Sequence, residues 1–160
     1  MSYLDTKSSK PDISEYGSVD PAPPSKVQNI AKLESILVDE SMRMFERMRV
    51  VFTLRNINSS ESIDALSKGF KSGSALLRHE IAYVMGQMQN NHALPILENV
   101  LSDEDEHVMV RHEAAEALGA IGDIRAKNTL EMYLEHNLPE ISESCEVALD
   151  LLAHHNSELV

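Results

Sequence analysis

The 160-residue sequence has one cysteine, no tryptophan and no long apolar run. The single Cys145 cannot form an internal disulfide or a thiolate cage, so a bound metal would need nitrogen and oxygen ligands. No segment approaches the roughly 20 consecutive apolar residues of a membrane-spanning helix, and the N-terminus lacks the basic start and apolar middle of a signal peptide. We therefore expect a cytoplasmic protein with no membrane partner.

Aromatic residues are also scarce, at 4%, and the chain has only six glycines and six prolines. A core of Leu, Ile, Val, Met and Ala favours helices over a sheet sandwich. Lys and Arg number 14 against 26 Asp and Glu, which gives a formal net charge of −12. This charge repels phosphate backbones, so we expect no nucleic-acid partner. It suits a basic or polyamine-like substrate, but it also fits a helical protein that is merely kept soluble.

The first 25 residues differ in pattern from the rest of the chain. They show no apolar periodicity and end in Val19–Pro24, where prolines disfavour a helix. We predict a disordered tail or linker over residues 1–25 and one repeat domain over residues 26–160. Apolar-periodic segments in that domain predict eight helices. Their approximate ranges are 27–38, 42–56, 60–70, 74–89, 92–101, 107–120, 124–135 and 139–154.

The even-numbered predicted helices are copies of one another. Leu76–Gly86 aligns with Met109–Gly119 at an offset of 112 − 79 = 33 residues. A copy around Arg47 lies upstream at 78 − 47 = 31, and one around Glu143 lies downstream at 143 − 112 = 31. Each helix pair can bury its apolar face only against its neighbours. The repeat therefore predicts an all-α fold, an α-solenoid of four HEAT-like helix pairs.

The two middle copies carry His-Glu dipeptides, His79-Glu80 and His112-Glu113, which the end copies lack. At 100° per residue, His79 points about 200° away from the apolar stripe of Leu77, so it is not an ordinary core histidine. Imidazoles on neighbouring helices about 8 to 10 Å apart can share a metal, and adjacent carboxylates supply oxygen ligands of the kind non-haem iron takes. The pairs equally fit polar residues that solvate a groove near helix starts.

Four longer motifs are Ser18–Pro24, Gly73–Glu80, Met109–Ile121 and Glu143–Asp150. Together they resemble the deoxyhypusine hydroxylase family, and the likeness runs from about Tyr16 to Ala153. The resemblance implies a HEAT-repeat di-iron monooxygenase. Such an enzyme uses molecular oxygen to hydroxylate deoxyhypusine, a lysine extended by an aminobutyl group, on a translation factor.

The resemblance also implies roles for individual residues. His79, His112 and Glu113 match iron ligands of the family. Glu80 matches the carboxylate that holds the cationic amine of the substrate during catalysis, and Met109 matches a residue that lines the substrate pocket. These roles come from the matching motifs and not from spacing.

Only the C-terminal half of the family's chain, with its linker, resembles this sequence. Since each half of the family carries two His-Glu pairs, two irons need a second half. That half could come from a homodimer or from a partner chain, or the chain could be a truncated product without catalysis. An alternative from another class is a catalytically silent HEAT-like module whose acidic groove binds a basic protein segment.

Overall fold

The computed structural model describes residues 11–157 of the chain. Within this range it contains eight α-helices, three short 3-10 helices and no strand beyond an isolated antiparallel bridge between Ile13 and Val19. None of the described helices is long and apolar enough to cross a membrane. The predicted all-α class and the eight helices are confirmed. The α-helices are α1 (Ile30–Leu37), α2 (Met44–Ile57), α3 (Ser60–Lys68), α4 (Ala75–Met88), α5 (Leu94–Ser102), α6 (Val108–Ile121), α7 (Lys127–Met132) and α8 (Pro139–Ser157).

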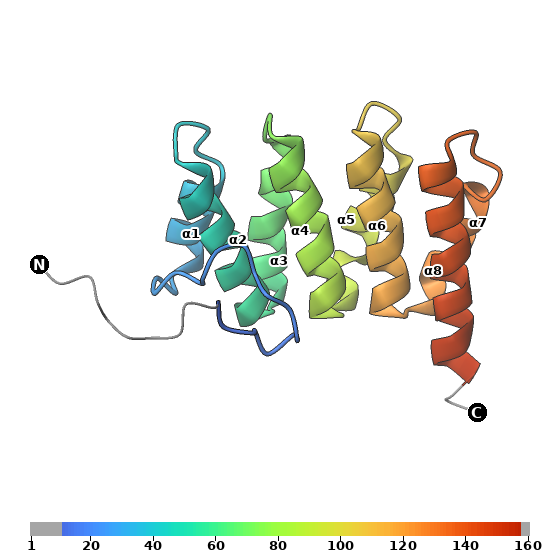
Figure 1. The fold of residues 1–160 in the computed structure, drawn as a ribbon, viewed down its shortest axis with the longest axis horizontal. Coiled ribbons are helices and arrows are strands. Elements are labelled where there is room, and N and C mark those ends of the chain that lie inside the picture. The colour runs from blue at the N-terminus through green and yellow to red at the C-terminus, as the bar shows by residue number, and fades with distance from the viewer. Residues whose placement is uncertain (1–10, 158–160) are drawn as a thin grey trace, which may run out of the picture.

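The helices form a row of four antiparallel pairs (Figure 1). Helices α2, α4, α6 and α8 lie side by side in one layer, and α1, α3, α5 and α7 lie behind them in a second layer. One apolar core runs between the layers through all four pairs. This arrangement confirms the predicted α-solenoid, in which each pair is stabilised by its neighbours.

Two of the predicted helices start with a tight 3-10 turn instead of an α-helical turn. Asn90 accepts a hydrogen bond from the backbone of His92, and Asp123 accepts one from the backbone of Arg125. Such short side-chain-to-backbone bonds stabilise turns in competition with the α-helix. As a result α5 begins at Leu94 and α7 at Lys127, each two or three residues later than predicted.

Helices α4 and α6 place their histidines at equivalent positions. The Ser74 hydroxyl caps α4 by accepting from the backbone of Leu77, and His107 Nδ1 caps α6 by accepting from the backbone of Met109. With these caps, His79 and His112 are each the fifth residue of their helix. Both imidazoles therefore project from the same position along their helix axes.

Two glycines allow the site-bearing helices to approach closely. A Cβ atom added at Gly86 would lie 3.0 Å from Ala117 Cα, and one added at Gly119 would lie 2.8 Å from Ala148 Cα. The backbones of α4, α6 and α8 are thus nearly in contact at matching positions. This close packing fixes the spacing between the His-Glu positions of successive repeats.

Residues 11–25, here called the N-terminal segment, contain no helix and contact α2. The backbone N–H of Ser25 donates to Thr53 Oγ1 at 2.7 Å, and the Arg49 guanidinium donates to the carbonyl oxygens of Pro23 and Pro24. Residues 1–10 of the predicted tail lie outside the described residues. The boundary near residue 25 between tail and repeat domain stays a prediction.

Candidate metal centre

The His-Glu residues of the two middle repeats converge. The Nε2 atom of His79 on α4 lies 3.1 Å from Oε1 of Glu113 on α6. The same Glu113 oxygen lies 3.8 Å from Nε2 of His112. One carboxylate therefore stands between two imidazoles from successive repeats. The Glu80 carboxylate lies 3.8 Å from the other ring nitrogen, Nδ1, of His79.

These side chains are partly buried and lie outside the apolar core. Exposed fractions are 29% for His79, 23% for His112, 18% for Glu80 and 13% for Glu113. The helical spacing predicts that the histidines point away from the apolar stripe, and the structure agrees, because Leu77 of that stripe is fully buried. The four side chains therefore remain partly accessible to a solute.

Sequence reasoning missed Glu116 as a member of this cluster. Within residues 11–157, His112, Glu113 and Glu116 each offer one ligand atom, and these atoms lie within 4.8 Å of one another. Glu116 Oε1 is 3.6 Å from His112 Nε2. The signal was present, since a spacing of i, i+4 puts His112 and Glu116 on one helix face. An imidazole with two carboxylates suits divalent transition metals such as iron.

Burial of the carboxylates favours a cation at the cluster. Desolvation by burial raises the pKa of Glu80, opposed by the charge of His79 and reinforced by that of Asp20. Burial also raises the pKa of Glu113, where His79 opposes the shift and Glu116 reinforces it. Carboxylates that are costly to ionise in this environment gain stabilisation from an added positive charge.

Met109 lies in the first turn of α6 and is 41% exposed. It precedes His112 by three residues and Glu113 by four, so it shares their side of the helix. Its role in lining a substrate pocket stays a prediction.

A cavity of about 410 Å³ adjoins the His-Glu cluster. Tyr16, Tyr83 and Gln87 line it together with Glu113 and Glu116. Two aromatic rings and two carboxylates thus border the same space. This combination suits a chain that is apolar along its length and positively charged at a nitrogen.

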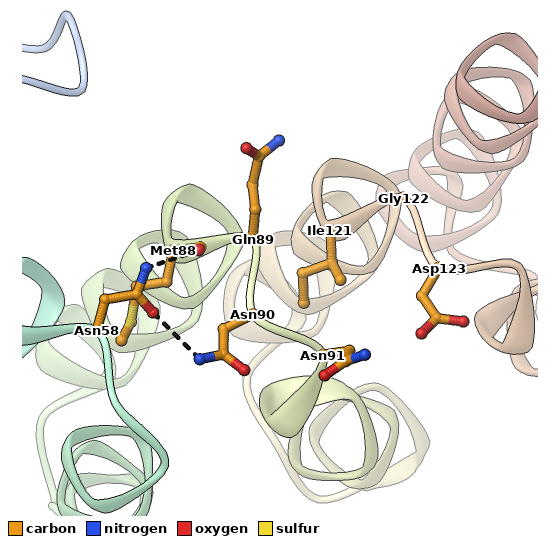
Figure 2. Close-up of a pocket in the computed structure, with 8 residues that line it drawn as sticks. All are labelled: Asn58, Met88, Gln89, Asn90, Asn91, Ile121, Gly122 and Asp123. Carbon is orange, nitrogen blue, oxygen red and sulfur yellow. Dashed lines mark hydrogen bonds between the residues drawn. The ribbon is translucent and has the colours of Figure 1, made fainter. Parts of the chain in front are cut away.

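A second cavity, of about 520 Å³, lies at the C-terminal ends of α2, α4 and α6 (Figure 2). The Asn58 amide donates to the backbone oxygen of Met88 at 3.0 Å, and the Asn90 amide donates to Asn58 Oδ1 at 3.3 Å. Gln89 likewise donates to the Ala120 backbone. These amides bind neighbouring repeats to one another, so we place the candidate site at the His-Glu cluster.

A sequence profile described as HEAT repeats matches residues 30–108 and 63–150, which together cover most of the chain. The chain belongs to the HEAT-repeat family. This HEAT-repeat chain is 46% identical to the deoxyhypusine hydroxylase of Danio rerio over 146 residues, 91% of this chain and 48% of that protein. It is 43% identical to the deoxyhypusine hydroxylase of Homo sapiens over 154 residues, 96% of this chain and 51% of that protein.

A solved structure of human deoxyhypusine hydroxylase in complex with glycerol matches the same fold. Its TM-score is 0.86 at 45% sequence identity, and the match covers 91% of this chain and 50% of that one. This HEAT-repeat chain is therefore a homologue of deoxyhypusine hydroxylase, as the sequence resemblance predicted. It spans about half the length of the curated relatives that it matches.

Proposed function

We propose that the chain is an iron-binding half of a deoxyhypusine hydroxylase, a monooxygenase that converts deoxyhypusine to hypusine on a translation factor. The observation that carries the proposal is the Glu113 carboxylate, which stands between His79 and His112 from successive repeats of a homologue of that enzyme. A metal held by all three residues would join two neighbouring helices.

The donor set fits iron. Imidazole nitrogens and carboxylate oxygens bind non-haem iron, and His79, His112 and Glu113 would hold it. Cys145 is no competitor as a ligand, because it is fully buried and burial raises the pKa of its thiol to about 11. When bound, iron supplies the activation of molecular oxygen that hydroxylation of a carbon requires.

The protein residues around the cluster would bind and orient the substrate. In the described part of the chain, no lysine or arginine forms an ion pair with Glu80, whose carboxylate therefore remains available to a cationic amine. Tyr16 and Tyr83 offer aromatic surfaces for the aliphatic part of the deoxyhypusine side chain. Met109, exposed on the same side of α6, adds apolar contact.

A second half-site would complete the reaction centre. This chain contributes two imidazoles and their neighbouring carboxylates, which are too few to fill the coordination of two irons. We propose that the remaining ligands come from a second copy of the chain or from a partner chain. The mass of the native complex, measured with metal content on the same sample, tests this. A metal-loaded species that is only monomeric contradicts the homodimer version.

Two variants test the iron site directly. We expect His112→Ala and Glu113→Ala to abolish iron retention while circular dichroism shows unchanged helical content. The matched control is His92→Ala, since His92 forms a surface pair with Asp64 on α3, away from the cluster. Unchanged iron retention in both variants contradicts the proposal, and unfolding assigns the side chains a structural role.

The competing function is a catalytically silent HEAT-like module that binds a basic protein segment. The net charge of −12 suits this function as well. It predicts a chain that purifies without iron, consumes no oxygen and still binds a basic peptide in a salt-dependent manner. Iron content together with oxygen consumption separates the two functions.

A further inference from the structure

The fourth repeat contributes a residue to the candidate metal centre, although it lacks a His-Glu pair. Ser144 on α8 lies 144 − 113 = 31 residues after Glu113 and so occupies the matching repeat position. Its Oγ atom is within hydrogen-bond distance of His112 Nδ1. Glu113 therefore reaches back to the histidine of the second repeat, and Ser144 reaches back to the histidine of the third.

The hydrogen bonds of Ser144 determine which nitrogen of His112 carries the proton. A hydroxyl has a single hydrogen to donate, and Ser144 Oγ donates it to the backbone oxygen of Glu140, which can only accept. Towards His112, the hydroxyl must then act as the acceptor. The neutral imidazole is therefore protonated at Nδ1.

This tautomer leaves the lone pair of His112 Nε2 free on the side of the carboxylates. Nε2 lies 3.8 Å from Oε1 of Glu113 and 3.6 Å from Oε1 of Glu116. A lone pair that faces two carboxylate oxygens is unfavourable unless a cation lies between them. The geometry is thus arranged for a metal ion.

The hydroxyl is held firmly enough to orient the ring. Ser144 is only 6% exposed, and its donor bond runs to the preceding turn of its own helix. Metal-binding histidines typically donate the other ring N–H to such an acceptor, which fixes the tautomer and the orientation. His79 differs, because its Nδ1 faces the Glu80 carboxylate at 3.8 Å.

We propose that Ser144 is a positioning residue that holds His112 with Nδ1 protonated, so that Nε2 is presented to the metal. The inference rests on the metal function proposed above. The fourth repeat would then contribute to the site through Ser144, although it has no His-Glu pair.

The first test reads the tautomer of His112 in the metal-free chain. Ring nitrogen-15 chemical shifts of His112 are recorded at about pH 8.5, roughly two units above the usual pKa of a histidine side chain. We expect Nδ1 to be protonated in the unaltered chain and the population protonated at Nε2 to grow in Ser144→Ala. A ring protonated mainly at Nε2 in the unaltered chain overturns the proposal.

The second test measures the affinity of the whole chain for Co²⁺, followed by visible absorption. We expect Ser144→Ala to weaken binding about 10-fold to 100-fold and Ser144→Thr, which keeps the hydroxyl, to restore it. Ser142→Ala is the matched control, since Ser142 lies about 200° around α8 from Ser144. The proposal is contradicted if the Ser144→Ala variant has the same Co²⁺ affinity and the same His112 tautomer as the unaltered chain.

The two readouts separate this inference from the proposed function. If the unaltered chain binds no Co²⁺, the metal function fails, and the nitrogen-15 shifts alone still decide the role of Ser144. If Ser144→Ala does not fold, the unaltered chain and the Ser144→Thr variant decide it, because both retain the hydroxyl that the proposal requires.

Discussion

The carboxylate of Asp20 and the guanidinium of Arg55 form a bidentate salt bridge that attaches the N-terminal segment to α2. Oδ2 accepts from Nη2 at 2.6 Å and Oδ1 from Nη1 at 2.9 Å. Arg55 is fully buried, and the ring of Tyr16 lies over it at 4.5 Å. Tyr16 also lines the cavity beside the His-Glu cluster. The ion pair thus anchors to α2 the N-terminal segment, which supplies Tyr16 to the wall of the cavity.

Removal of the Asp20 carboxylate should destabilise the protein. Asp20→Ala leaves the Arg55 guanidinium buried with Gln87 Oε1 as its remaining side-chain acceptor on a neighbouring helix. Breaking one side of a buried pair costs about 3 kcal/mol, which urea unfolding measures. Asp12→Ala, at an exposed position in the same segment, is the control and should be nearly neutral. Equal unfolding midpoints for the two variants contradict the prediction.

The stability of the fold should fall in acid as Asp123 becomes protonated. Hydrogen bonds from the Arg125 side chain and backbone lower the pKa of Asp123 to about 2. Because this folded value lies below the unfolded value of about 3.9, the stabilisation is complete above that pH and disappears as the pH falls towards 2.

To isolate this effect, the free energy of unfolding of the unaltered chain is compared with that of its Asp123→Asn variant across pH. We expect the difference in free energy of unfolding to be constant above about pH 5, to shrink as the pH falls and to approach its limiting value only below about pH 2. The subtraction removes the opposite contributions of Glu80 and Glu113, whose pKa values burial raises. A difference that does not change with pH rules out the Asp123–Arg125 pair as its source.

Substitution of the contact glycines should disrupt the spacing of the repeats. A methyl group at Gly119 would lie 2.8 Å from Ala148 Cα, a backbone atom that cannot move aside without shifting α8. We expect Gly119→Ala to cost about 1 to 3 kcal/mol in thermal or urea unfolding and Gly86→Ala to cost less. Gly73→Ala is the control, because no atom lies within 4 Å of the added Cβ. A loss in Gly73→Ala as large as in Gly119→Ala refutes the contact argument.

Glu116 should contribute to metal affinity. Its carboxylate belongs to the cluster with His112 and Glu113, so Glu116→Gln removes one negatively charged oxygen from the group that could hold a metal. We expect the affinity for Fe²⁺, measured by anaerobic equilibrium dialysis, to fall about 10-fold. Glu146→Gln, an exposed position on α8, keeps the same net charge as this variant and should bind normally. Equal affinities for the two variants would place Glu116 outside the ligand set.

The repeat pattern was sufficient to predict the helices and the solenoid. Copies at a nearly constant offset must stack in the same way, and each pair buries its apolar stripe only against its neighbours. The pattern did not predict the 3-10 turns before α5 and α7. These turns depend on single hydrogen bonds of Asn90 and Asp123, which the apolar periodicity does not record.

Arg55 is a second feature that the pattern missed. It lies 86 − 55 = 31 residues before Gly86 and so occupies the same repeat position as the contact glycine of α4. A buried arginine in a helix core is unfavourable unless a carboxylate reaches it. That carboxylate belongs to Asp20, 35 residues away in a proline-rich segment where no periodic pattern operates.

By itself, the sequence determined the class of fold, the number of repeats and the side of the helices on which His79 and His112 stand, because helical periodicity and repeat offsets are local properties. Only the tertiary structure decided that Glu113 lies between the two imidazoles, that Glu116 joins them and that Ser144 approaches His112 from the last repeat. Those contacts join residues on different helices or depend on side-chain conformation, and the close approach of α4, α6 and α8 at Gly86 and Gly119 sets their distances.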